Sequence, residues 1–447
     1  MSIVQPTLLS LGRAAVIAFA TFVVLLLMGP GVRGTPRRWR TRIFWLAAAA
    51  LFTPGFVIGF LYLKPSPDER WMGPETAYTL LVWSRLSLVA ILVAGLLPPA
   101  ISDEASHCIV LTGANWRKVV LAEIRAWGSG IWLAVALVFL LAFQEFDIAT
   151  TWNMRAWTVA LFDAQAGGLA LSETLRLAAA PFAVQTVLIA ALVFAARHRR
   201  HSTVFNGAET RRSFLALLPC SLAFCFISLP ALFTPILAIR EFTLKGYGIL
   251  ASAPVKEIIG ALALSLSAVL ITWPFAGWIE KRRGWRWMLA LPGLLGPLLC
   301  GLLLLALIQL PPLHLLRDTV FPTVIGLALM LLPYALLLRF GIETTRDGTA
   351  LHIARVSGGR RAAWQLDGWP RLCAGLMLFC FAYGDFTINS LLAPPQFTSA
   401  SVRLLNLLHY GRSSALMVMF LLAFAVPLSA ALLTVIVAHL YPHRRAS

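Results

Sequence analysis

Charged residues are scarce in this sequence of 447 residues: they make up 13% of it, whereas hydrophobic residues make up 59%. A soluble domain typically carries about 25% charged residues, and one water-soluble core could not bury so much apolar surface. A bilayer accepts such surface, because its hydrocarbon core is spanned by helices of roughly 20 apolar residues. The shortage of charge argues against a soluble globular protein and predicts an all-α, polytopic membrane protein.

Cysteine and the common catalytic motifs are also scarce or missing. Only six cysteines occur and none forms a CxxC pair, which argues against a disulfide framework or a zinc site. There is no GxxxxGK[ST], GxSxG or HExxH motif, so the chain offers no ATP-binding P-loop of its own. His107 and His352 belong to no carboxylate–His cluster, and we expect neither a metal nor another cofactor on this chain.

Acidic residues are outnumbered by basic ones, 19 to 37, for a net charge of +18. In a soluble protein this excess would suggest nucleic acid. Here the basic residues sit in short loops between apolar segments, and no loop is long enough to form a basic domain. The positive-inside bias of membrane proteins explains the charge better, so we expect no nucleic-acid partner.

About eleven apolar segments are long enough to span a bilayer. They lie at 9–30, 43–63, 77–100, 127–145, 177–196, 214–239, 257–279, 287–310, 319–340, 372–393 and 413–440. With the N-terminus outside, the inside loops carry more than twice as many Lys and Arg as the outside loops. The charge order around the first segment is that of a retained helix and not of a cleaved signal peptide. We therefore expect a multi-pass protein of the cell (inner) membrane, surrounded by lipid, with its N-terminus outside and its C-terminus in the cytoplasm.

Two of the predicted inside loops resemble each other. In each, a His precedes a Gly by six residues (His107 and Gly113, His352 and Gly358), and a Trp with basic neighbours follows. Those tryptophans are Trp116, beside Arg117, and Trp364. The likeness predicts an internal repeat.

The repeat extends to both sides of these loops. Upstream, each half has a Pro-Gly pair within a span, at 54–55 and 292–293; downstream, each has an acidic-aromatic pair, at 145–146 and 385–386. Both loops lie inside, so the two repeats run in the same sense, related by an axis along the membrane normal. The predicted organisation is a first repeat of five spans (1–196), a cytoplasmic linker (197–213) and a second repeat of six spans (214–447).

The repeated loop resembles the coupling loop of binding-protein-dependent (type I) ABC importer permeases. That family's loop has a Glu-Ala-Ala start, a Gly a few residues on and a closing apolar-Pro element. Ile353-Ala354-Arg355, Gly358 and Trp369-Pro370 follow this pattern, and the segment 108–113 follows it more loosely. His107 and His352 stand where the family has Glu. The segment 392–411 is similar to the two-domain permeases of the ferric-iron and thiamine group.

The resemblance implies the type-1 permease fold and a transport function, with no enzymatic activity in this chain. It implies a cytosolic ABC ATPase dimer that hydrolyses ATP, and an extracytoplasmic solute-binding protein that delivers iron(III) or a similar small solute. The coupling loops would be about 101–126 and 341–371. The residues expected to serve ATPase coupling are His107, Gly113, Trp116, Arg117, His352, Ala354, Arg355, Gly358 and Trp364.

Three charged residues are candidates for the translocation path. Glu145 and Asp385 lie at equivalent outside ends of spans, where they either line the path and favour a cationic substrate or have ordinary interfacial positions. Arg85 either faces the path or extends outward to the membrane surface, and outward extension is favoured. Its counterpart in the second predicted repeat, Met330, is apolar. Pro54 with the Gly55–Gly59 pair indicates either a kinked gate helix or simple close helix packing.

Two other classes of function compete with the importer. A membrane-embedded glycosyltransferase or polymerase would need clustered catalytic residues in a sizeable outside loop, and the longest such stretch, about 146–176, contains no His. A secondary transporter would need charged residues at mid-membrane, and the predicted spans contain few.

Overall fold

The computed structural model describes residues 3–33, 55, 58–59, 62, 73–96, 129–197, 253–281, 286–345, 348–357, 359, 363–394, 396–409, 415–416, 418–423, 425–426 and 429. Within these ranges the ordered elements are helices and no strand occurs. The all-α prediction is therefore confirmed for the described part. The chain divides into two compact units, Met1–Ala231 and Leu232–Ser447.

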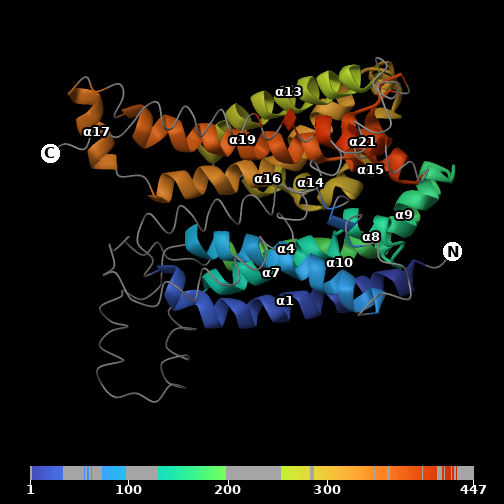
Figure 1. Cartoon of the computed structure of the whole chain (residues 1–447), viewed down its shortest axis with the longest axis horizontal. Coiled ribbons are helices and arrows are strands. Elements are labelled where there is room, and N and C mark those ends of the chain that lie inside the picture. Colours follow the sequence, from blue (N-terminus) through green and yellow to red (C-terminus); the bar gives the residue numbers. More distant parts are fainter. Residues whose placement is uncertain are drawn as a thin grey trace. The chain divides into compact units, whose positions relative to one another are not determined.

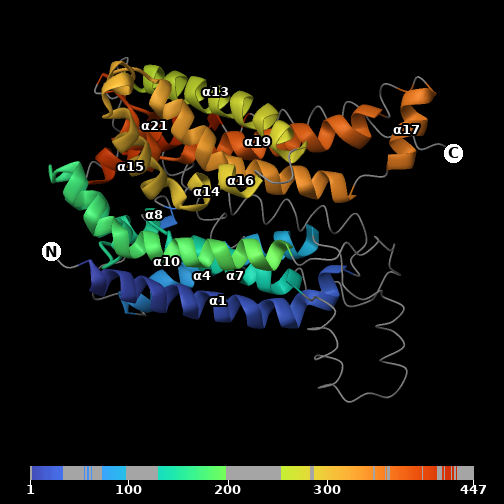
Figure 2. The same cartoon turned by 180° about the vertical axis from the view of Figure 1, so that it is seen from behind.

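The first unit is built on long helices that run alongside one another (Figures 1 and 2). They are α1 (Val4–Arg33), α4 (Pro74–Leu96), α7 (Ser129–Phe143) and α10 (Leu171–Arg197), with two short helices, α8 (Asp147–Thr151) and α9 (Trp157–Ala166), between the last two. Each of α1, α4 and α7 packs against the other two, and α10 packs against α7.

The second unit repeats this kind of packing with a different set of helices. Its long helices are α13 (Ala253–Lys281), α16 (Phe321–Thr345) and α19 (Trp369–Gly384), and each packs against the other two. The shorter elements are α14 (Arg286–Leu294), α15 (Gly296–Ile308), η5 (Pro311–Leu316), α17 (Gly348–Val356), the π-helical turn η6 (Trp364–Gly368), α20 (Thr387–Leu392) and α21 (Ala400–His409).

Five described stretches are long and apolar enough to cross a membrane: Val4–Leu26, Ile131–Thr151, Leu171–Val193, Val255–Lys281 and Phe321–Glu343. Their outer faces are apolar; on α13, for example, Leu270 is 66% exposed while Ala268 is fully buried. The two buried hydroxyls of α13 are satisfied inside that helix: Ser265 donates to the carbonyl of Ala261 at 2.6 Å and Thr272 to that of Ala268 at 2.7 Å. This pattern is the one a lipid environment demands of a spanning helix.

Two predicted spans are interrupted. The segment 287–310 forms α14 and α15, which meet at Gly296 with a φ of 83°, a conformation open chiefly to glycine. The segment 372–393 forms α19 and α20, because Asp385 has extended backbone angles, φ −70° and ψ 127°. As uninterrupted helices, these two predictions are wrong.

Other predicted spans lie partly or wholly outside the described residues. The segment 43–63 is described only at Gly55, Ile58, Gly59 and Tyr62, and 413–440 only in part. The segment 214–239 and the linker 197–213 lie outside apart from Arg197. The number of spans and the two-repeat organisation therefore stay predictions.

Candidate functional site

The chain turns sharply after α7, and Glu145 organises this first corner (residues 145–148). One carboxylate oxygen, Oε1, accepts the backbone N–H of Ile148 at 3.1 Å, at the start of α8. The backbone carbonyl of Glu145 accepts the hydroxyl of Thr158 at 2.9 Å, at the start of α9. The side chain of Glu145 is only 8% exposed. A buried carboxylate thus fixes where two short helices begin.

Arg85 faces this corner from the midpoint of α4. Its Nη1 lies 3.7 Å from Oε2 of Glu145 and 4.0 Å from Oδ2 of Asp147. Asp147 also accepts a backbone hydrogen bond from Gly55. The Arg85 side chain is 15% exposed and turned toward both carboxylates, and the choice between facing the path and extending outward to the membrane surface stays a prediction. One cation holds two carboxylates at the end of an apolar helix, where an isolated charge would be costly.

Gly55 and Gly59 lie against the short helix α8. A Cβ added to Gly55 would come within 2.6 Å of Cβ of Asp147, and one added to Gly59 within 2.9 Å of Cβ of Thr151. The indole Nε1 of Trp152 donates to the carbonyl of Gly59 at 2.9 Å. The GxxxG pair therefore packs closely on α8, as small residues allow in membrane proteins; a gating role for it stays a prediction.

The second corner (residues 385–388), between α19 and α20, has the same local hydrogen bonds. Oδ2 of Asp385 accepts the backbone N–H of Ile388 at 2.9 Å. The hydroxyl of Ser401, the second residue of α21, donates to the Asp385 carbonyl at 2.8 Å, as Thr158, the second residue of α9, does to Glu145. The Asn389 side chain adds a donor to the same carbonyl at 2.6 Å.

The second corner differs from the first in what holds its short helix in place. A Cβ on Gly326 of α16 would lie 2.8 Å from Cδ1 of Leu392 and 3.0 Å from Cγ2 of Ile388. Met330, the counterpart of Arg85 in the sequence repeat, is buried in one apolar cluster with Ile388 and Leu392. Aliphatic side chains thus occupy the place that the charged groups take in the first corner.

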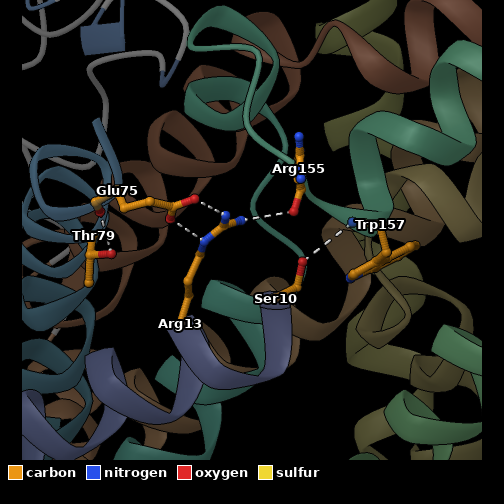
Figure 3. Close-up of polar contacts among 6 residues, drawn as sticks. All are labelled: Ser10, Arg13, Glu75, Thr79, Arg155 and Trp157. Carbon is orange, nitrogen blue, oxygen red and sulfur yellow. Dashed lines mark hydrogen bonds and ion pairs between the residues drawn. The ribbon is translucent and has the colours of Figure 1, made fainter. Parts of the chain in front are cut away.

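A third polar contact joins α1 to α4 (Figure 3). The guanidinium of Arg13 donates to both carboxylate oxygens of Glu75, at 2.6 and 2.8 Å, and to the carbonyl of Arg155 at 3.1 Å. It also lies 5.4 Å from the ring centroid of Tyr78. Figure 3 shows the neighbouring contact, in which the Trp157 N–H donates to the Ser10 hydroxyl. These contacts tie the beginnings of α1 and α4 to the segment after α8.

Between α16 and α19 the chain forms the helix α17, within the predicted second coupling loop. Figures 1 and 2 show α17 turned across the direction of α16 and α19, at the end where α16 finishes and α19 begins. Leu351 and Ala354 are buried, whereas Ile353 is 61% and Val356 75% exposed. The N–H of Gly359 donates to the carbonyl of Ala354 at 2.9 Å, the bond pattern that closes many helices.

The turn before α19 is π-helical and carries Asp367, which forms two ion pairs. Asp367, 13% exposed, lies 3.4 Å from Nη2 of Arg355 on α17 and 2.9 Å from Nη2 of Arg371 on α19. The indole of Trp364 lies directly over Gly368, where any side chain would collide with it. Single π turns occur often at functional sites.

The predicted coupling residues are only partly described. His352 and Arg355 are exposed on α17, Trp364 is about half exposed, and Ala354 is buried. The remaining five lie outside the described residues: His107, Gly113, Trp116, Arg117 and Gly358. Nothing in the structure therefore bears on the first loop.

Several functional candidates were missed from the sequence. Asp147 and Asp367 are single acids whose partners lie on other helices. A further pair joins α13 to α16: Nε of Arg339 donates to Oε2 of Glu280 at 2.9 Å, and the guanidinium lies 5.2 Å from the ring centroid of Trp273. The spacing of Trp273 and Glu280, two helical turns apart on α13, was the available signal.

In the described part of the chain, no group of three or more His, Cys, Asp and Glu side chains could hold a metal ion. Comparison of the sequence with protein-family models and with curated proteins, and of the structure with solved structures, finds no match. The corners, α17 and the charged contacts are the features of the described residues that bear on function.

Proposed function

We propose that this chain is the membrane-spanning permease subunit of an ATP-driven importer of the binding-protein-dependent ABC class. In this proposal about eleven spans form two parallel repeats, and the termini lie on opposite sides of the cell (inner) membrane, the N-terminus outside. A cytosolic ATPase dimer docks on the two coupling loops. An extracytoplasmic binding protein delivers the solute.

The observation that carries the proposal is α17. It is a short helix between two long apolar helices, and its exposed apolar side chains, Ile353 and Val356, lie at the end of α19 opposite the Asp385 corner. Exposed apolar residues at the end of a spanning helix need a partner or lipid to cover them. Docking into a groove of a cytosolic ATPase covers them and transmits motion to α16 and α19.

The two corners support the repeat on which this proposal depends. Glu145 and Asp385 each accept the N–H of an isoleucine three residues on, and each carbonyl accepts a hydroxyl from the second residue of the following helix. The helix triads α1–α4–α7 and α13–α16–α19 precede the corners in the same order. Such agreement in local geometry favours two copies of one structural unit.

Iron(III) or a similar small solute is proposed as substrate from the resemblance of the later half alone. Both corner carboxylates already accept backbone N–H groups, and Glu145 also faces Arg85. The corners therefore do not favour a cationic solute over others, and in this proposal the binding protein selects the substrate.

The test is purification of the tagged chain from its own membranes under mild detergent. We expect an ATPase to co-purify and to hydrolyse MgATP, and we expect Ile353→Asp or Val356→Asp to remove it, because a buried carboxylate opposes docking in an apolar groove. Leu315→Asp is the matched control, since Leu315 is 87% exposed but lies on η5, before α16. If wild-type chain carries no ATPase activity, the importer proposal is wrong.

A second candidate, an ion-coupled secondary transporter, is favoured by one observation. Arg85 sits at the midpoint of α4 and faces two carboxylates, and charged groups inside a bilayer mark ion pathways in such transporters. In that case chain purified without any ATPase would dissipate a proton gradient imposed on proteoliposomes, and Glu145→Gln would stop it. The importer proposal predicts no such leak.

A further inference from the structure

The connection from α17 to α19 contains two successive glycines, Gly358 and Gly359. Glycine permits a wide range of backbone conformations, so the sequence of this connection does not by itself fix the angle between the helices that flank it. If α17 receives the motion of a partner, that motion reaches α19 only when contacts other than the backbone hold the two helices together.

Asp367 supplies such a contact. Its carboxylate is 13% exposed and lies 3.4 Å from Arg355 and 2.9 Å from Arg371. Arg355 belongs to α17, on the far side of the connection. Arg371 is four residues after Asp367, on the α19 side of the connection, so the ion pair between them does not link α17 to α19. Of these two ion pairs, the one with Arg355 joins the helices.

The turn that presents Asp367 is continuous with α19. Its π-helical turn runs directly into α19 at Trp369. Trp364 covers Gly368, which has no room for a side chain. Asp367 therefore lies on a helical run that continues into α19, and α19 runs without interruption to Gly384, next to the second corner.

We infer that Asp367 is a positioning residue whose ion pair with Arg355 holds α17 to the π-helical turn that leads into α19; we call this contact the lock. When α17 is displaced, α19 then moves with it, and the motion reaches the second corner. The inference rests on the proposed function, because it needs a partner that displaces α17. It assigns a role to a residue that lies within the predicted loop 341–371 but is none of the predicted coupling residues, on contacts that the sequence did not reveal.

The lock is tested first in the chain alone, in lipid nanodiscs. Spin labels replace two exposed residues, Val356 on α17 and Leu372 on α19, in a chain whose six native cysteines are changed to alanine. Pulsed electron–electron double resonance then gives the distribution of distances between the two spin labels. We expect one narrow distribution when Asp367 is present.

Removing the ion pair between Asp367 and Arg355 should let α17 move independently of α19. Asp367→Asn and Arg355→Gln should each lower the ratio of locked to unlocked chains by about fivefold, the factor for about 1 kcal/mol lost from an ion-pair network. Arg371→Gln is the matched control and should leave the distribution narrow, and Asp367→Glu should largely preserve it. A narrow distribution in both Asp367→Asn and Arg355→Gln overturns the lock.

The coupling role is tested in the complex with its co-purified ATPase. An environment-sensitive dye at Asn406, exposed on α21 after the second corner, reports MgATP-driven motion. Asp367→Asn should leave MgATP hydrolysis but reduce the dye signal about fivefold, in line with the loss of the locked state. A full signal in Asp367→Asn overturns the inference and leaves the importer standing, whereas a wild-type chain without any ATPase overturns the importer and leaves the distance test of the lock unaffected.

Discussion

The two corners share their backbone hydrogen bonds but are held to their surroundings in opposite ways. In the first corner, Arg85 faces Glu145 and Asp147. In the second, Met330, Ile388 and Leu392 form part of an apolar cluster. One local geometry therefore tolerates both a charged and an aliphatic neighbourhood, provided that each is complete. The ion pairs of the first corner carry a cost in desolvation that the apolar side chains of the second corner avoid.

Removal of Arg85 should have the largest effect on stability, because the two corners differ most in this residue. Arg85→Met gives the first corner the residue of the second, but leaves two carboxylates without their cation. Breaking a buried pair by deleting one partner costs about 3–5 kcal/mol. We expect the free energy of unfolding, measured by SDS titration in mixed micelles, to fall by that amount.

If the corner geometry tolerates an uncharged neighbourhood, the stability lost in Arg85→Met can be regained by removing the two carboxylates as well. Arg85→Met combined with Glu145→Gln and Asp147→Thr removes all three charges and gives position 147 the residue found at position 387. We expect this triple variant to regain most of the lost stability. If Arg85→Met alone were as stable as wild type, the ion cluster would contribute nothing to the first corner.

Neutralising the acid of each corner shows how much each carboxylate charge contributes to stability. Glu145→Gln retains an acceptor for the Ile148 N–H but loses the attraction to Arg85, so we expect a cost of about 1.5–3 kcal/mol, as for a hydrogen bond to a charged group. Asp385→Asn loses only the charge on a capping acceptor and should cost less than about 1 kcal/mol. Equal costs in the same SDS titration would mean that the two acids have equivalent surroundings.

Filling the glycine contacts should cost less stability than removing Arg85. In Gly55→Ala the new methyl meets Cβ of Asp147, which is close to the backbone and cannot move far, at 2.6 Å; in Gly326→Ala it meets the tip of Leu392, which can rotate, at 2.8 Å. We expect about 1–3 kcal/mol for the first, as for other overpacked sites, and less for the second. Gly12→Ala is the control, since nothing lies within 4 Å of the added atom.

The smallest effect is expected at Arg13. Its partner Glu75 is 61% exposed, and ion pairs that reach solvent contribute only about 0–1 kcal/mol. Arg13→Gln should therefore leave the unfolding midpoint nearly unchanged. A cost comparable to that of Arg85→Met would show that this contact is as fully removed from water as the first corner is.

The long helices could be predicted from the sequence because apolar length is an additive, local property. α1, α13 and α16 coincide closely with the predicted segments 9–30, 257–279 and 319–340. The break at Gly296 was missed, because hydropathy averages over a whole window and does not register one residue with a different backbone angle. For the same reason the predicted segment 372–393 runs past Asp385, although Asp385 was expected at the outside end of a span.

The charged contacts could not be predicted, for a different reason. Arg85 meets Glu145 and Asp147 about 60 residues away along the chain, and only the packing of α4 against α7 brings them together. Asp367 likewise meets Arg355 across a connection whose path the sequence does not specify. The sequence shows the acidic-aromatic pairs at 145–146 and 385–386 but does not reveal their capping hydrogen bonds.

The central claim is that α17 docks on an ATPase, and a photo-crosslinking residue at Val356 tests it most directly. The chain is irradiated in its native membranes, and the crosslinked product is identified by mass spectrometry, with a crosslinker at Leu315 as control. We expect a cytosolic protein with a GxxxxGK[ST] P-loop to be crosslinked at Val356 and not at Leu315. Crosslinks from Val356 to lipid alone, or to a protein without that motif, would contradict it.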